Sequence, residues 1–142
     1  MTTAIDVAAE VIALERAALD RWGQGDPSVY LALFADEITY FDPAQEQRVD
    51  GAAAMAALFA PITGKIRVDC YDLLRPFVQQ HGDTALLSFN LVSYRTDGGR
   101  ERAISSWNAT EAYRRTPQGW RIFHSHWSFI RPELKDANPE TA

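Results

Sequence analysis

The second half of this sequence contains four long segments with the alternation typical of β-strands, separated by short turns. Apolar and polar residues alternate along each segment, as expected for strands with one buried face. The connections, such as Asp-Gly-Gly at 97–99 and Pro-Gln-Gly at 117–119, carry the residues that tight hairpin turns need. Long strands joined in this way pair as an antiparallel meander. This half of the sequence therefore predicts a curved sheet, one face of which must be covered by other parts of the chain. The four segments are residues 65–79, 84–95, 102–115 and 120–131.

The first half predicts helices that can cover this face. Apolar residues spaced by three or four predict an amphipathic helix that begins near Thr3 and Asp6 and ends near Gly23. A second, shorter helix begins at Asp26 and Pro27, because aspartate caps a helix and proline fits its first position. The apolar positions of the two helices are Val7, Val11, Leu14, Ala18, Trp22, Tyr30, Leu33 and Phe34.

A short strand and a third helix complete the first half. The β-branched and aromatic run at 38–41 predicts the strand. Asp50 and Gly51 precede the third helix, whose length Pro61 limits. Its core positions are Met55, Leu58, Phe59 and Ile62. Three N-terminal helices followed by a curved antiparallel sheet define an α+β fold class.

Length and charge exclude several classes of protein. The 142 residues suffice for one domain, which we place at 1–131, with a flexible tail expected at 132–142. The net charge is −5 and no run of five basic residues occurs, so we expect no nucleic-acid partner. No apolar stretch is long enough to span a membrane, and the N-terminus lacks the pattern of a signal peptide. The single cysteine, Cys70, excludes an intramolecular disulfide framework, so we expect a cytoplasmic protein without a membrane partner.

Alternation places aromatic residues on one sheet face, which we expect to pack against the helices. On the last strand, Phe123 and Trp127 share this face and Ile122 lies on the other. Glu111 lies in the same row as Trp107 on the preceding strand. A cone-shaped sheet leaves space at its wide end, so part of this face is expected to line an apolar pocket. The predicted pocket residues are Tyr40, Phe89, Trp107, Phe123 and Trp127.

The opposite sheet face is neutral and polar, whereas a solvent-exposed face normally carries more lysine and glutamate. Such a face suits a contact between two subunits, and we expect a homodimer. His124 and His126 project from this face and are two of the ligands that a zinc or iron site needs. Serine and asparagine are the only candidates nearby for a third ligand, so we predict interface histidines and no metal. The predicted interface residues are Asn90, Asn108, Thr110, His124, His126 and Ser128.

Two stretches resemble known proteins. Leu-Phe-Ala-Asp-Glu-Ile-Thr-Tyr-Phe-Asp-Pro at 33–43, followed by Val-Asp-Gly at 49–51, resembles a recurrent pattern of the NTF2-like superfamily, which includes SnoaL-like cyclases and ketosteroid isomerases. The end of the chain, with Trp120 followed by His124, His126 and Ser128, is similar to the association domain of calmodulin-dependent kinase II. The resemblance covers residues 5–131 and implies a cone-shaped, cystatin-like fold. This fold hosts enzymes, binding domains and assembly modules alike.

The resemblance to ketosteroid isomerases implies a pair of acids. The general base of that family matches Asp42, and the acid of its oxyanion hole matches Glu111, eight residues before Gly119. The chain departs from the family at Ala18, where the isomerases carry a hydrogen-bonding tyrosine. The pocket arginines of the kinase association domain would fall at Glu111 and Trp127, so the acidic-ligand pocket of that domain is not implied.

Each acid also has a structural alternative. Asp42 follows a strand, where its side chain can cap a backbone N–H of the turn. A buried Glu111 is costly unless it is protonated or paired, and Arg67, Arg75 and Arg95 are the candidate partners. If both acids face one cavity, their repulsion keeps one of them protonated near neutral pH.

The sequence therefore predicts a protein that binds a small apolar organic molecule and needs no cofactor. In one interpretation it is an enzyme in which Asp42 and Glu111 perform acid–base chemistry on a carbonyl compound, as an isomerase, cyclase or dehydratase. In the other it is a non-catalytic association module, as the neutral sheet face favours. A solvent-reachable cavity lined by both acids separates the first from the second.

Overall fold

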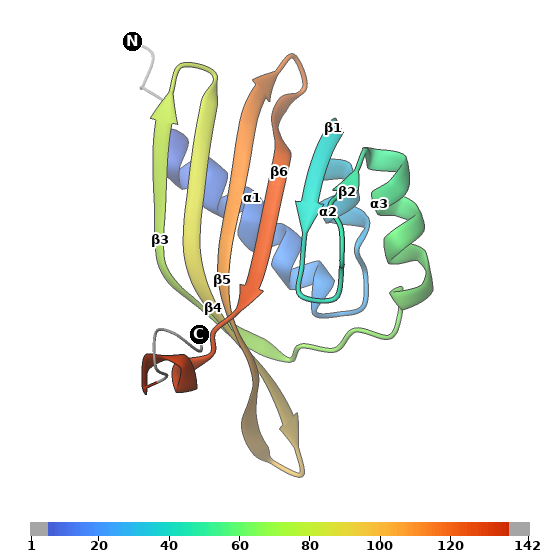
Figure 1. Ribbon diagram of the computed structural model, residues 1–142, viewed down its shortest axis with the longest axis vertical. Coiled ribbons are helices and arrows are strands. Elements are labelled where there is room, and N and C mark those ends of the chain that lie inside the picture. The colour runs from blue at the N-terminus through green and yellow to red at the C-terminus, as the bar shows by residue number, and fades with distance from the viewer. Residues whose placement is uncertain (1–5, 137–142) are drawn as a thin grey trace.

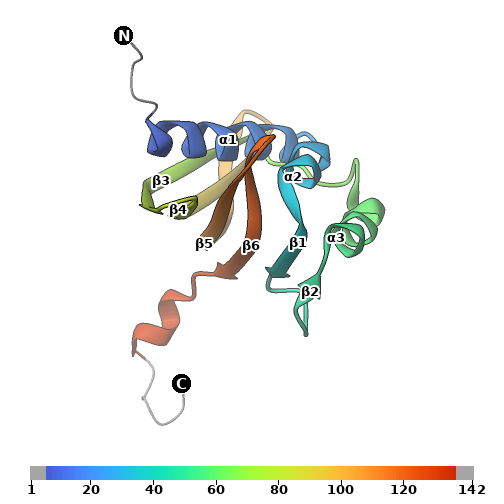
Figure 2. The ribbon, with the colours of Figure 1, turned by 90° about the horizontal axis from the view of Figure 1, so that it is seen from above.

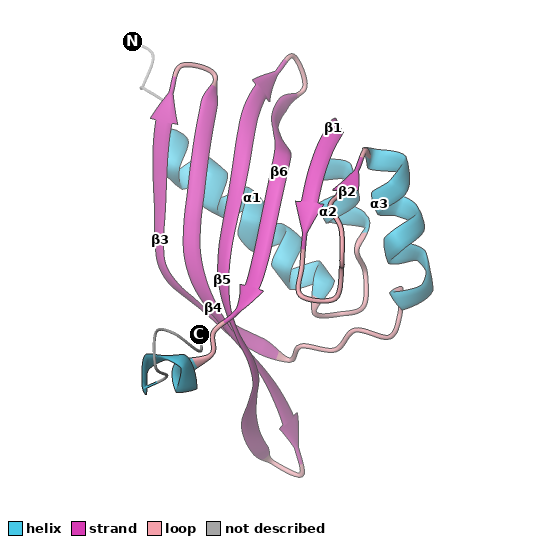
Figure 3. Cartoon of the chain, viewed as in Figure 1, coloured by secondary structure: helices cyan, strands magenta, loops and turns pink. Residues whose placement is uncertain are grey.

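The protein, seen in a computed structural model that describes residues 6–136, packs its helices against one six-stranded sheet (Figure 1, Figure 3). The helices are α1 (Val7–Trp22), α2 (Ser28–Leu33) and α3 (Ala52–Phe59), with short 3₁₀ helices η1 (Ala60–Ile62) and η2 (Pro132–Asp136). The strands are β1 (Phe34–Phe41), β2 (Val49–Asp50), β3 (Cys70–His81), β4 (Thr84–Asp97), β5 (Arg100–Thr116) and β6 (Gly119–Phe129). Their order in the sheet is β2-β1-β6-β5-β4-β3. The predicted α+β class, with three N-terminal helices, is confirmed.

Four strands form the predicted antiparallel meander, and two more extend it at one edge. β3, β4, β5 and β6 pair antiparallel in chain order. β1 pairs in parallel with β6, where Thr39 lies opposite His124, and β2 pairs antiparallel with β1. The parallel pair arises because β1 belongs to the helical half of the chain and reaches the sheet without a hairpin.

Helix α1 crosses one face of the sheet (Figure 2) and begins at the predicted cap. The Asp6 carboxylate accepts a hydrogen bond of 3.2 Å from the backbone N–H of Ala9. At the start of α2, the Asp26 carboxylate accepts one of 2.9 Å from the backbone N–H of Ser28. The residues that the three helices bury are Val11, Glu15, Ala18, Leu19, Tyr30, Leu33, Met55 and Phe59.

A β-bulge in β6 changes which residues face the helices. Tyr113 pairs with Ile122 and Ala112 pairs with His124, so Phe123 is the extra residue. Ile122 is fully buried, although strict alternation predicts it on the outer face. That prediction is wrong because the bulge shifts the alternation by one residue. Phe123, predicted on the inner face, lies at the bulge and is partly exposed.

The segment before β3 is held against the end of α1 instead of joining the sheet. The N–H of Gly64 donates to the carbonyl of Gly25 (2.7 Å), and the N–H of Val68 donates to the carbonyl of Gly23 (2.9 Å). The predicted start of this strand at Lys65 is therefore wrong, because these backbone groups bond the turn after α1 and β3 starts later. Gly25 and Gly64 have φ values of 83° and 80°, which glycine adopts without strain.

The chain continues past β6 into η2. Of the range 132–142, in which we expected a flexible tail, Pro132–Asp136 forms this 3₁₀ helix, and 137–142 lie outside the described residues. Within residues 6–136, no helix has the length and apolar character needed to cross a lipid bilayer.

We expect Gly23→Ala to lower the free energy of unfolding by about 1–3 kcal/mol. A Cβ at this position would lie 2.5 Å from the carbonyl oxygen of Val68, so the segment before β3 would have to move. Urea denaturation followed by tryptophan fluorescence measures the loss. Gly82→Asn is the matched control, because a side chain there meets open space and asparagine tolerates a positive φ. An equal loss in both variants would contradict the importance of this close approach.

Candidate functional site

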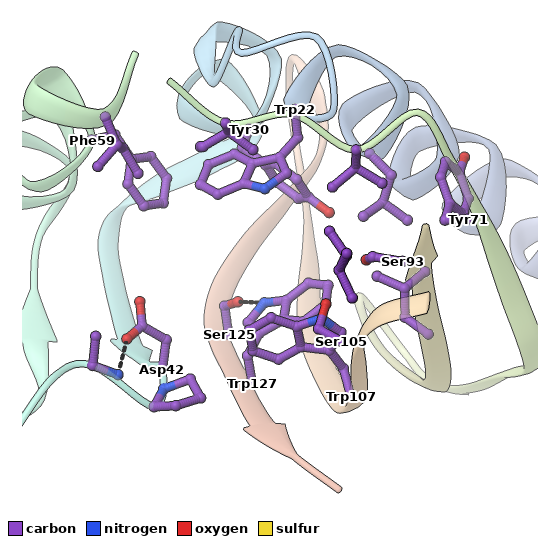
Figure 4. Close-up of a pocket in the computed structure, with 18 of the residues that line it drawn as sticks. Trp22, Tyr30, Asp42, Phe59, Tyr71, Ser93, Ser105, Trp107, Ser125 and Trp127 are labelled. Atoms are coloured by element: carbon purple, nitrogen blue, oxygen red, sulfur yellow. Dashed lines mark hydrogen bonds between the residues drawn. The ribbon is translucent and has the colours of Figure 1, made fainter. Parts of the chain in front are cut away.

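A cavity of about 620 Å³ lies between the inner face of the sheet and the helices (Figure 4). Its aromatic lining comes from α1, α2, α3 and four strands, and the polar groups are few. The aromatic residues are Trp22, Tyr30, Phe34, Tyr40, Phe59, Tyr71, Trp107, Trp127 and Phe129. The polar and charged residues are Asp42, Gln45, Lys65, Arg67, Ser93, Arg95, Ser105 and Ser125. Such a lining suits an apolar ligand with a small number of directional contacts.

The structure brings three of the five predicted pocket residues to this cavity. Tyr40, Trp107 and Trp127 line it. Phe89 is buried behind Trp127, with its ring edge-on at 5.6 Å between centroids. Phe123 lies away from the lining because of the bulge in β6.

Two tryptophans on neighbouring strands form a fixed corner in the cavity wall. The indole N–H of Trp107 donates to Ser105 Oγ (2.9 Å), and that of Trp127 donates to Ser125 Oγ (3.0 Å). The two indole rings lie 5.7 Å apart at 89°. Each serine stands two residues before its tryptophan on the same strand face, so this repeated arrangement holds both rings in place.

Asp42 directly follows β1 and lines the cavity (Figure 4). Its Oδ1 accepts a hydrogen bond from the backbone N–H of Ala44 (2.8 Å), and its Oδ2 accepts one from the Tyr40 hydroxyl (2.9 Å). Asp42 therefore caps the turn and lines the cavity at once, so the two alternatives for this residue coexist. Burial is the main cause that raises the pKa of Tyr40, and the charge of Asp42 raises it further. The Tyr40 hydroxyl therefore keeps its proton and acts as a hydrogen-bond donor.

Glu111 is fully buried and does not line the cavity. The cavity lined by both acids that we expected for an enzyme is therefore not seen, and Asp42 alone of the pair lines it. Among residues 6–136, neither of its carboxyl oxygens has a hydrogen-bond partner and no arginine forms an ion pair with it. Arg67 instead pairs with Asp69 and Asp97. Burial is the main cause that raises the pKa of Glu111 well above its ordinary value, and the charge of Glu15 raises this pKa further. The nearby polar groups of β6 have the opposite, smaller effect. Burial without a hydrogen-bond partner therefore favours the protonated form of Glu111.

Glu15 on α1 is a second fully buried acid, which the sequence analysis missed. Its carboxylate accepts hydrogen bonds from the hydroxyls of Tyr30 and Tyr113, the latter at 2.8 Å. Burial raises its pKa to about 7, against the opposing effect of the two tyrosines. The signal was present, because Glu15 follows Val11 by four residues on the apolar stripe of the helix.

The predicted interface residues lie on the outer sheet face, as alternation indicated. The Asn90 side-chain amide donates to Asn108 Oδ1 (2.7 Å) across neighbouring strands. The Nδ1 of His124 is 2.7 Å from the Thr39 hydroxyl, and the rings of both His124 and His126 pack against Phe41. Within the described part of the chain, no three histidine, cysteine or acidic residues gather as metal ligands would.

Helices over the inner face of a curved sheet, with an acid at the rim of an apolar cavity, define the class of NTF2-like proteins. Within that class the chain belongs to the SnoaL-like domain family, whose sequence profile matches residues 11–132. No curated protein sequence matches the chain.

Solved structures support the same assignment. A candidate ketosteroid isomerase from Parabacteroides distasonis is 32% identical, with a TM-score of 0.78 over 90% of this chain and 91% of its own. An NTF2-like protein of unknown function from Pseudomonas putida is 26% identical, with a TM-score of 0.72 over 96% of this chain and 100% of its own. The calmodulin-dependent kinase II hub of S. rosetta is 21% identical, with a TM-score of 0.71 over 90% and 100%, a likeness of fold alone. The predicted resemblance to the NTF2-like superfamily is confirmed.

Glu111→Gln is expected to make stability less dependent on pH and to raise it by about 1–3 kcal/mol at mildly alkaline pH. Because the pKa of Glu111 is raised in the folded chain, the folded state keeps a proton that the unfolded chain has released. Stability therefore falls as the pH rises above the ordinary glutamate value of 4.5. Glutamine cannot ionise, so the variant lacks this part of the fall.

Urea denaturation over a series of mildly acidic to mildly alkaline pH values measures this effect. Glu10→Gln, at an exposed position on α1, is the control and should follow the native protein. A pH profile of Glu111→Gln parallel to that of the native protein would show that Glu111 is not a protonated buried acid.

Proposed function

We propose that this protein binds a small apolar organic molecule with a carbonyl group. In this proposal, Asp42 removes a proton from the carbon next to that carbonyl. The observation that carries the proposal is the position of Asp42, a carboxylate at the rim of a cavity with mostly aliphatic and aromatic walls. A general base must lie within hydrogen-bonding reach of the proton that it removes, and a ligand in this cavity meets that carboxylate. Isomerisation, cyclisation and dehydration can all begin with this step. The candidate ketosteroid isomerase of P. distasonis, at 32% identity, supports the reaction class.

Proton removal beside a carbonyl places negative charge on the carbonyl oxygen, which needs a hydrogen-bond donor. Ala18 offers none. We assign this role to Ser125, which lines the cavity and is only 1% exposed. Ser125 Oγ accepts the indole N–H of Trp127 at 3.0 Å, so its own proton can be donated either to the ligand or to Glu111, which lies next to it.

Glu111 then acts from behind the cavity wall. It lies directly opposite Ser125 in the pairing of β5 with β6. As a neutral acid it adds no negative charge next to the developing enolate, whereas a carboxylate there would repel the enolate and attract the Ser125 proton. We therefore assign Glu111 a positioning role rather than contact with the ligand.

Asp42→Asn is expected to lower kcat by at least about 100-fold and to leave ligand affinity nearly unchanged. Asparagine keeps the shape of the side chain but cannot accept the proton. A panel of cyclic β,γ-unsaturated ketones serves as substrates, because their isomerisation to conjugated enones is followed by ultraviolet absorbance. Asp36→Asn, at an exposed position in β1, the strand before Asp42, is the matched control.

Full activity of Asp42→Asn would remove this residue from the mechanism. If no ketone in the panel binds to the native protein, the proposed ligand class is wrong.

We also propose that two copies of the chain associate through the outer sheet face. The supporting observation is that this face is mostly polar and uncharged, with Arg75 beside Asn90 and Thr110, and carries exposed apolar side chains, with Phe77 60% and Leu74 42% exposed. Asn90 and Asn108 are paired with each other, so they can be covered without leaving an unpaired amide. This association is compatible with either interpretation of the cavity.

Thr110→Arg is expected to convert the dimer into a monomer. Thr110 lies between Ser88 and His126 in the middle of the outer face, and two arginines brought together there would repel each other and lose water. Light scattering coupled to size-exclusion chromatography gives the mass in solution. Ala17→Arg, on the exposed side of α1, is the control. A native protein that is already monomeric, or a Thr110→Arg dimer, would contradict the proposal.

A further inference from the structure

We infer that the ligand is an amphipathic anion, with its apolar body in the cavity and its anionic group bound by Lys65 and Arg95. This inference rests on the proposed function, because it concerns the same cavity and specifies the class of molecule that enters it. A carboxylate, sulfonate or phosphate would provide the shared chemistry of the anionic group.

The charge of the cavity lining is opposite to that of the chain. The protein has a net charge of −5, yet within residues 6–136 the charged side chains of the lining are three cations, Lys65, Arg67 and Arg95, and one acid, Asp42. A surplus of positive charge beside an apolar cavity favours a ligand that carries negative charge.

Arg67 is already neutralised. Its guanidinium contacts the carboxylates of Asp69 at 2.6 Å and Asp97 at 3.1 Å, and it donates to the carbonyl of Thr96 at 2.7 Å. These bonds tie the segment before β3 to the end of β4. Arg67 therefore has a structural role, which leaves Lys65 and Arg95 as the cations that a ligand can use.

Arg95 has donors to spare. Its Nε–H donates to the backbone carbonyl of Arg67 at 2.8 Å, and no carboxylate among residues 6–136 forms an ion pair with it. A guanidinium has five N–H groups in a planar fork that matches a carboxylate. The hydrogen bond to the backbone uses only Nε, so the N–H groups at the outer edge of the Arg95 guanidinium remain available to a ligand. The Arg95 side chain is half-buried.

Lys65 stands on a segment whose backbone is fixed. Its N–H donates to the carbonyl of Ile62 at 2.9 Å, and the neighbouring Gly64 is bonded to Gly25 at 2.7 Å. No ion pair engages its ammonium group within the described residues. The Lys65 side chain is exposed, so it can reach an anion at the mouth of the cavity without exposing any buried group to solvent.

Arg95 and the acid occupy different walls. Asp42 directly follows β1, whereas Arg95 comes from β4, the strand of Ser93, and Asp42 and Ser93 lie on opposite sides of the cavity (Figure 4). An anion bound by Arg95 therefore avoids the Asp42 carboxylate. The apolar body would then extend past the corner formed by Trp107 and Trp127 towards Asp42.

Two dyes with the same aromatic body test the inference. 8-Anilino-1-naphthalenesulfonate carries a sulfonate, and N-phenyl-1-naphthylamine is the same molecule without it. Titration with each dye, followed by fluorescence, gives two dissociation constants for each form of the protein. Lys65→Gln and Arg95→Gln are each expected to weaken binding of the sulfonate dye by about 3- to 10-fold and to change binding of the neutral dye by less than about 2-fold. Added salt should weaken binding of the sulfonate dye alone.

The controls separate this inference from the proposed function. Lys135→Gln removes a charge from η2, which lies on the other side of the sheet from α1 (Figure 2), and should change neither constant. Ile62→Trp places a large side chain in the cavity lining and should weaken both dyes. Equal losses for the two dyes in Lys65→Gln and Arg95→Gln, or no loss for either, would overturn the inference and leave the apolar cavity as a binding site. If neither dye binds the native protein, or Ile62→Trp affects neither, the cavity is no binding site and the proposed function fails as well.

Discussion

The sheet of this protein is larger than its helices can cover, and the site follows from that mismatch. β5 has 17 residues and, at roughly 3.3 Å per residue, spans about 56 Å. α1 has 16 residues and spans about 24 Å, and it crosses the strands instead of running along them (Figure 2). Where the helices cover the inner face, its side chains form the core, as Ile122 does. Where the helices stand away from the sheet, aromatic side chains such as Trp107 line a cavity between the two layers.

The core itself contains polar groups whose protonation is set by burial. Two carboxyl groups, those of Glu15 and Glu111, lie among apolar side chains, where an unpaired charge would cost several kcal/mol. Tyr30 and Tyr113 donate hydrogen bonds to Glu15, which favours charge on that acid and leaves the proton on Glu111. Because Tyr30 also lines the cavity, the buried acids and the cavity share a wall. The electrostatic environment inside the cavity therefore depends on residues that do not line it.

The sequence predicted most of the fold because alternation and turn residues are local signals. The four strands of the meander and the three helices lie where the patterns indicated, with shifts at their ends. Three features depend on distant pairing and have no local signal: the parallel contact of β1 with β6, the bulge at Phe123, and the bonds from the segment before β3 to the turn after α1. For the site, sequence analysis identified Asp42 and the two tryptophans. It missed Glu15, because a helical acid is usually exposed, and it did not anticipate that Glu111 lies beneath the lining.

The two interpretations of the chain, enzyme and association module, concern opposite faces of the same strands. On β5, Trp107 and Glu111 point to the helices, and Asn108 and Thr110 point outwards. A substitution on one face changes side chains that the other face does not present, because neighbouring residues of a strand project in opposite directions. Association through the outer face therefore does not compete with ligand binding on the inner one. In the proposed dimer, the outer face would make the partner contact while the cavity on the inner face holds the ligand, so the two proposals need different residues of the same strands.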